Sequence, residues 1–228
     1  FAADWINDAE SISYYTEYSD VISSDNNINV VYRFNVPVKG TVKLYYELEH
    51  TNNDYVTFSV VDPYVYSSSN VDKVVGDIQT FDKGYSSVRD VYYQYSSITL
   101  KSGEYYLLLH NGSNQIGENF NFSLKFTPIF SNTSVSKVTA KKKAFNVKWK
   151  KASGATGYEI QYSLKKNMKG SKKTKVKSAS STSKTIKSLK AKKKYYVRIR
   201  TYKTVKINGK NKTYYGKWSG KKTVTTKK

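Results

Sequence analysis

Phe120-Asn121-Phe122-Ser123-Leu124-Lys125-Phe126 alternates apolar and polar side chains without a break. Successive side chains of a β-strand point to opposite faces, so this stretch predicts a strand with one face in a core and the other in solvent. Shorter runs of the same type precede it, at Val31–Pro37, Thr41–Glu49 and Tyr55–Val61, and Pro, Gly, Asn or Asp residues separate them. About eight short strands with no helical period predict an antiparallel sandwich.

The segment Thr127–Ser134 follows this strand and separates two regions of opposite charge. Residues 1–133 hold 8 Lys and Arg against 16 Asp and Glu, a net charge of −8. Residues 134–228 hold 31 Lys and Arg against the single acid Glu159, a net charge of +30. A break this sharp at a Pro-, Ser- and Asn-containing segment indicates two folding units. We predict an acidic domain over 1–130, a linker over 131–134 and a basic domain over 135–228.

Within the acidic half, several strands resemble the bacterial pre-peptidase C-terminal domain over roughly residues 10 to 127. The resemblance lies in Tyr32-Arg33-Phe34 closed by Pro37 and Gly40, in Leu100-Lys101-Ser102-Gly103-Glu104-Tyr105-Tyr106-Leu107, and in the closing Phe120–Phe126 strand. It implies a jelly-roll-like sandwich that is appended to secreted peptidases and surface proteins and is not itself catalytic. Residues 67–90 show only a weak strand pattern and are expected to be mostly connections.

The basic half resembles a fibronectin type III domain over about residues 134 to 227. Four stretches carry the resemblance: Ala144–Lys150 with Trp149 as the buried indole, Gly157–Ser163, Tyr195–Tyr202, and Tyr215-Gly216-Lys217-Trp218-Ser219. Leu189 precedes Tyr195 by six residues, as in the tyrosine corner of such domains, where a phenol hydrogen-bonds back to the chain. The overall prediction is an all-β chain of two antiparallel sandwiches in tandem, jelly-roll-like and then fibronectin type III or immunoglobulin-like.

Composition and motifs argue against catalysis. The chain has no Cys, which excludes disulfides, thiolate metal sites and cysteine nucleophiles. His50 and His110 stand alone, and we expect His110 to be a loop residue. No zinc-protease, serine-hydrolase, phosphate-loop or dinucleotide motif occurs. We therefore expect a non-enzymatic protein, and we expect it to be monomeric. The resemblance to domains of Gram-positive surface and secreted proteins implies that it is secreted or attached to a Gram-positive cell surface.

Candidate ligand sites in the acidic half are of two kinds. Loop carboxylates around Asp72 and Asp77 are the best place for calcium, although no Asp-x-Asp-x-Asp-Gly spacing supports a site and solvated turns are the simpler interpretation. No other cofactor is expected. Outward rings at Tyr64, Tyr66, Tyr92 and Tyr93 would form a flat platform for a sugar or peptide, unless tyrosine serves only as a good strand residue.

The basic half contains the more informative candidates. Of its 31 cations 29 are Lys, and they include the triplets Lys141, Lys142, Lys143 and Lys192, Lys193, Lys194. These triplets and the pairs Lys165-Lys166 and Lys172-Lys173 are expected at turns. Lysine is a hydrated point charge without the planar fork of arginine, so it favours diffuse attraction to a polyanion over specific nucleic-acid recognition.

An anionic cell-wall polymer or glycan is the expected partner of the lysines. Three alternatives remain: an accessory C-terminal region of a larger secreted peptidase or glycoside hydrolase, direct nucleic-acid binding, and a spacer whose charge only aids solubility. No apolar run is long enough to span a membrane.

Overall fold

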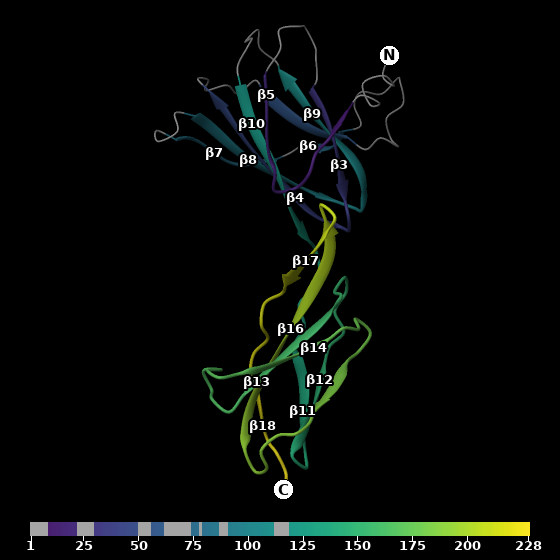
Figure 1. Ribbon diagram of the computed structural model, residues 1–228, viewed down its shortest axis with the longest axis vertical. Helices are drawn as coiled ribbons and strands as arrows, with labels where there is room; N and C mark the ends of the chain where they lie inside the picture. Colours follow the sequence, from purple (N-terminus) through teal and green to yellow (C-terminus); the bar gives the residue numbers. More distant parts are fainter. Residues whose placement is uncertain are drawn as a thin grey trace. The chain divides into compact units, whose positions relative to one another are not determined.

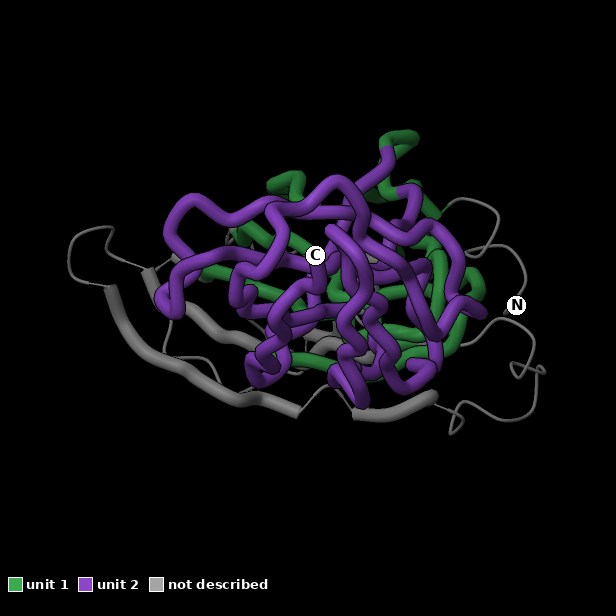
Figure 2. The backbone as a smooth tube through the Cα atoms, turned by 90° about the horizontal axis from the view of Figure 1, so that it is seen from below, with its two compact units in different colours: residues 1–128, 207–210 green, residues 129–206, 211–228 purple. Residues whose placement is uncertain are grey.

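A computed structural model of the protein describes residues 9–21, 30–49, 56–61, 74–77, 79–86, 91–111 and 119–228 (Figure 1). The chain divides into two compact units, residues 1–128 with 207–210 and residues 129–206 with 211–228 (Figure 2). Every regular element in the described ranges is a β-strand, which confirms the all-β prediction. The position of the two predicted domain boundaries stays a prediction.

The first unit contains two five-stranded sheets. One sheet has, in spatial order, β1 (Glu10–Ser11), β3 (Val30–Val36), β9 (Gly103–Asn111), β5 (Val56–Val61) and β6 (Val74–Asp77). The other has β2 (Glu17–Val21), β10 (Asn119–Pro128), β4 (Gly40–Glu49), β8 (Val91–Leu100) and β7 (Gln79–Ser86). Only β1 and β3 pair in parallel among these neighbours. Strands distant in sequence, such as β2 and β10, therefore lie side by side.

The core of this unit follows the alternation along β10. Phe120, Phe122, Leu124 and Phe126 are all buried, as the alternating pattern predicts. In the antiparallel register Leu124 lies opposite Leu44 of β4, so apolar side chains of neighbouring strands share one face. These buried side chains contribute to the hydrophobic core of the described part of the unit.

Three details differ from the sequence prediction. Residues 74–86 form two strands, β6 and β7, instead of mainly connections, because edge strands gain ladder hydrogen bonds without a strong period-2 pattern. His110 lies within β9 and not in a loop, because the ladder to β5 continues past it. Adjacent strand residues face opposite ways, which predicts one ring of the Tyr105-Tyr106 pair in the core and one outside, but both are buried. Tyr106, on the other side of β9 from Tyr105, is directly opposite Arg33 and donates to Glu104 Oε1 at 3.4 Å.

The second unit consists of two facing sheets. The three-stranded sheet has β11 (Val135–Lys141), β12 (Ala144–Trp149) and β15 (Ser183–Ile186). The other sheet has β14 (Lys172–Val176), β13 (Gly157–Ser163), β16 (Lys194–Ile207) and β17 (Lys210–Tyr215), and β18 (Lys222–Thr225) also pairs with β16. Lys172 and Lys173, expected at a turn, thus lie in a strand, because β14 pairs with β13 along its whole length.

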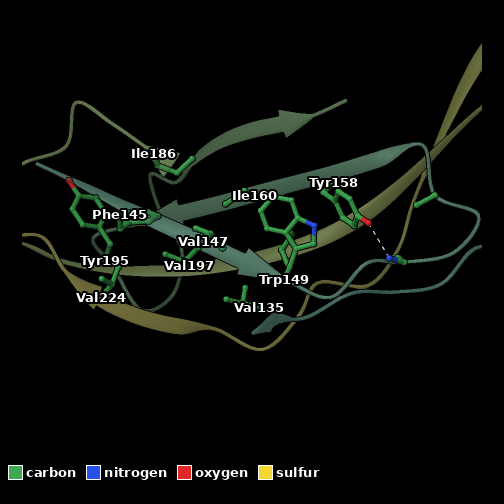
Figure 3. Close-up of a cluster of buried hydrophobic side chains, with 13 residues drawn as sticks. Val135, Phe145, Val147, Trp149, Tyr158, Ile160, Ile186, Tyr195, Val197 and Val224 are labelled. Carbon is green, nitrogen blue, oxygen red and sulfur yellow. Dashed lines mark hydrogen bonds between the residues drawn. The ribbon is translucent and has the colours of Figure 1, made fainter. Parts of the chain in front are cut away.

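Inward side chains of the two sheets form one hydrophobic core (Figure 3). Trp149 of β12 packs against Tyr158 of β13 with ring centroids 5.2 Å apart. The Tyr158 hydroxyl accepts from the Ala152 amide and donates to the Ala179 carbonyl, both at 3.0 Å, so its polar end is satisfied inside the core. These contacts fix both sheets and the loops beside them.

The crossover into β16 is tied to the same core. Tyr195 is buried, and its phenol oxygen accepts a hydrogen bond of 3.1 Å from the Lys190 amide. Leu189, just before Lys190, packs against the core cluster. The ring and its hydroxyl therefore position the loop that contains Lys190 to Lys193.

Gly157 offers a test of this packing. A Cβ at this position would lie 2.2 Å from the Val176 carbonyl oxygen and 2.7 Å from the Tyr202 hydroxyl. Because a backbone oxygen cannot move away cheaply, we expect Gly157→Ala to destabilise the second unit by about 3 kcal/mol. Hydrogen exchange of the β13 and β16 amides in the full chain measures this loss.

Gly220→Ala is the matched control for that substitution, because nothing lies within 4 Å of a Cβ built there. Unchanged exchange in both variants would contradict the packing described here.

Candidate anion-binding surface of the second unit

The lysines of the second unit lie on its surface. Residues 129–228 are described throughout, and 28 of their 29 lysines are exposed, with Lys203 half-buried. The core takes the apolar positions of each strand, so the lysines are left at the outward positions and in the loops. The positive charge that the sequence predicts is therefore open to solvent within this unit.

The unit's single acidic side chain does not offset this charge at the surface. Glu159 lies in β13, is only 5 % exposed, and sits opposite Arg200 of β16. Its Oε2 accepts from Arg200 Nε at 2.7 Å and lies 2.6 Å from Arg200 Nη2. The carboxylate thus pairs with Arg200 and lies opposite Lys175 in the ladder of β13 and β14, and residues 129–228 hold no second side-chain carboxylate to offset the other lysines.

Backbone hydrogen bonds bring three lysine-bearing segments together at one end of the unit. The Lys143 amide donates to the Lys227 carbonyl at 3.1 Å, and the Leu189 amide donates to the Lys143 carbonyl at 2.9 Å. The Lys192 amide donates to the Thr226 carbonyl at 3.1 Å. The turn after β11, the loop before β16 and the segment after β18 therefore meet, close to the C-terminus in Figure 1.

We call this end the lysine pole. It has eight exposed lysines, namely Lys141, Lys142, Lys143, Lys190, Lys192, Lys193, Lys194 and Lys227. The two triplets noted in the sequence are thus parts of one surface, although about fifty residues separate them. Lys190 and Lys227 belong to the same surface, and only the fold shows that they do.

Side-chain and backbone contacts hold the pole in shape. Thr226 is buried, and its hydroxyl donates to the Lys190 carbonyl at 2.6 Å and accepts from the Lys193 amide at 3.2 Å. Lys143 and Lys192 have φ angles of 44° and 51°, a left-handed conformation that non-glycine residues adopt at some cost. The surrounding hydrogen bonds compensate for that cost and keep the lysine backbones close.

The outer face of the five-stranded sheet, by contrast, is closed by its own side chains. Aromatic rings and cations alternate across it in the order Tyr202, Lys175, Tyr215, Arg200, Trp218 and Arg198. The Arg200 guanidinium lies 3.8 Å from the Tyr215 ring centroid and 4.3 Å from that of Trp218. We call this arrangement the cation–aromatic ladder.

The ladder uses both arginines of the unit. Arg198 Nε donates to Gln161 Oε1 at 2.6 Å, and Arg200 holds Glu159. The pKa of Lys175 is raised above its usual value, first by its hydrogen bond with Tyr215. Because these groups satisfy one another, the ladder fastens the segment after β17 to the sheet and does not offer a free anion site. In the sequence, the signal for this ladder is the pair Arg198 and Arg200 together with the aromatic residues Tyr215 and Trp218 near the end of the chain.

The candidates in the first unit fall largely outside the described residues. Asp72, Tyr64, Tyr66 and His50 are outside the described ranges. Asp77 lies in β6, and Tyr92 and Tyr93 lie in β8, but only the backbone of these strand residues is described. Asp77 was expected in a loop, and the pairing of β6 with β5 places it opposite Ser59 instead. The calcium site and the tyrosine platform stay predictions.

No group of three or more His, Asp or Glu side chains is placed to hold a metal in the described ranges. No helix there has the length and hydropathy needed to cross a bilayer.

Comparison with known proteins relates the second unit to a known family. Residues 128–218 match the family model of the fibronectin type III domain. This match confirms the resemblance to that family that the sequence of this stretch predicts. A search of the curated proteins finds no match to the chain.

Three solved structures are among those to which the chain is similar. The pre-peptidase C-terminal domain of a Bacillus anthracis collagenase is 17% identical, with 51% of this chain and 94% of that one covered and a TM-score of 0.37. A Fn3-like protein from Clostridium thermocellum is 21% identical, with 42% and 93% covered and a TM-score of 0.28. The adhesin domain of Epf from Streptococcus pyogenes is 17% identical, with 90% and 77% covered and a TM-score of 0.42. The families named from the sequence are thus both among the matches.

Trp218→Ala tests the role assigned to the ladder. The substitution removes the ring between Arg198 and Arg200, and we expect it to lower the stability of the second unit by about 2 kcal/mol. Urea unfolding followed by the fluorescence of the remaining tryptophans measures the change.

Trp218→Phe, which keeps a ring between the two guanidinium groups, is the control for the ladder. We expect it to recover most of the loss. Equal stability of Trp218→Ala and the unchanged chain would show that the ladder does not fasten the segment.

Proposed function

We propose that this protein is a non-catalytic binding protein of the bacterial cell surface, and that its fibronectin type III domain attaches it to an anionic wall polymer or glycan. Fibronectin type III and pre-peptidase C-terminal domains are typically accessory or binding modules and not catalysts. The non-catalytic, accessory or binding role therefore follows from the domain type. The anionic ligand and the location at the cell surface go beyond it and are what we propose.

One observation supports the proposal most directly. The lysine pole gathers eight exposed lysines, while Glu159, the unit's only acid, is buried against Arg200. Such a surface attracts polyanions, and the attraction raises association rates and local concentration. A uniform spread of lysine would act as a solubility device, whereas convergence from three segments favours a place where a polymer docks.

The chemistry of the cations favours a flexible polyanion over specific nucleic-acid binding. Base recognition uses planar, bidentate arginine or an inserted reading element, and single-strand binding uses rings open to stacking bases. The domain's two arginines are engaged with Glu159 and Gln161. The Trp218 and Tyr215 rings are engaged with those same arginines.

Salt dependence tests the electrostatic mechanism. Between about 50 and 500 mM salt the screening length falls from roughly 14 to 4 Å, so binding of the full chain to immobilised wall polymer should weaken steeply. Surface plasmon resonance with a neutral polysaccharide as control measures this. Binding that is insensitive to salt would overturn the mechanism.

A matched pair of variants locates the attraction. Replacing Lys141, Lys142, Lys193 and Lys227 by Gln removes four charges of the pole at positions with ordinary backbone angles. Each lysine near an anionic surface contributes on the order of 1 kcal/mol, so we expect affinity to fall at least about tenfold.

The control for the pole replaces Lys165, Lys166, Lys172 and Lys173 by Gln, which removes the same charge from another part of the domain. It should reduce affinity about threefold at most. Equal losses in both variants would mean that the pole is not the docking site.

A further inference from the structure

The outer face of the three-stranded sheet is a polar surface that continues from the lysine pole. Phe145, Val147 and Trp149 of β12 point into the core, so Asn146 and Lys148 point outward. The strand register places these outward residues in rows. The first row is Lys137, Lys148 and Ser183, and the second is Thr139, Asn146 and Thr185. Lys141, of the pole, is the next outward residue of β11.

The first row places like charges beside each other. Lys137 of β11 lies directly opposite Lys148 of β12, and both side chains are exposed. Like charges in directly opposed positions of a ladder are destabilising. No acidic side chain of residues 129–228 offsets them, since Glu159 lies in the other sheet. An anionic group between the two ammonium groups would remove this repulsion.

The second row supplies hydrogen-bonding groups without charge. Asn146 Nδ2 donates to Thr185 Oγ1 at 3.1 Å, and the Thr139 side chain is exposed beside them. Two hydroxyls and an amide in one row can donate to and accept from hydroxyl groups of a ligand. The row has no aromatic ring, so it is unsuited to stacking bases.

The spacing suits a polymer. Strands rise about 3.3 Å per residue, so Lys137 and Lys141 are roughly 13 Å apart along β11, with the neutral row between them. A ligand lying along this strand meets charge, then hydrogen-bonding groups, then charge. It reaches the lysine pole at Lys141.

We propose that the outer face of β11, β12 and β15 binds a polyol-phosphate polymer, with phosphates near Lys137, Lys148 and Lys141 and polyol hydroxyls on Thr139, Asn146 and Thr185. This proposal rests on the proposed function and specifies its ligand. Charge complementarity selects a polyanion, and the neutral hydroxyl row selects one that carries free hydroxyls. The opposite sheet is unavailable for this role because the cation–aromatic ladder occupies its outer face.

Two polymers of matched length and charge test the hydroxyl row: poly(ribitol phosphate) and inorganic polyphosphate, which lacks hydroxyls. In the full chain, Thr139→Val with Thr185→Val should lower affinity for poly(ribitol phosphate) at least about fivefold and leave polyphosphate binding unchanged. Thr223→Val with Thr225→Val, at two exposed positions of β18, is the control and should change neither. Equal effects on both polymers, or no effect, would overturn the hydroxyl assignment.

The lysine pair is tested by Lys137→Gln with Lys148→Gln against Lys165→Gln with Lys169→Gln, which removes equal charge from a turn. We expect the first variant to weaken poly(ribitol phosphate) binding about tenfold and the second about twofold. Equal losses in the two variants would overturn the assignment of this face while leaving the pole as the docking site. Failure of the unchanged chain to bind either polymer would overturn the proposed function itself.

Discussion

Burial of one face of each strand is the constraint on which the second unit depends. Val147 and Trp149 of β12 pack with Tyr158 and Ile160 of β13 and Val197 of β16 in one core. Those apolar positions alternate with outward ones, so a lysine at an outward position costs no packing. The domain can therefore carry a net charge of +30 over residues 134–228 and keep an apolar interior. Mutual repulsion is spread over the surface and is weakened by water and salt.

The outer faces of the two sheets of the second unit differ, although the amino-acid composition does not reveal this difference. On the five-stranded sheet, Arg198 bonds to Gln161, Arg200 pairs with Glu159, and the two guanidinium groups hold Trp218 and Tyr215 in place. On the three-stranded sheet, the outward lysines meet no acid. The arginines are paired on the sheet where they stabilise the domain, and the lysines on the outer face of the other sheet are exposed to solvent. That division is the physical basis for assigning binding to one sheet and structural support to the other.

The lysine pole shows how local backbone chemistry builds a surface. Thr226 holds the loop before β16 through its hydroxyl, and the Tyr195 phenol holds the same loop from inside the core. The turn after β11 is joined to it through the Lys143 carbonyl. Residues that bind nothing themselves thus determine which lysines lie together. A polymer would meet an arranged set of charges and not a flexible tail.

The sequence by itself determined the all-β class, the charge contrast between the two halves and the fibronectin type III assignment, because alternation along Phe120–Phe126 and Gly157–Ser163 and the positions of Trp149 and Tyr195 are local signals. It missed β6 and β7, whose edge pairing leaves a weak pattern, and it placed His110 in a loop. Only the tertiary structure decided which lysines converge, that Glu159 is buried against Arg200, and that Lys137 faces Lys148. The first two are contacts between segments far apart in the chain, and the third depends on the register of the β11–β12 pair. How strands pair and how whole sheets pack is not specified by a local pattern of residues.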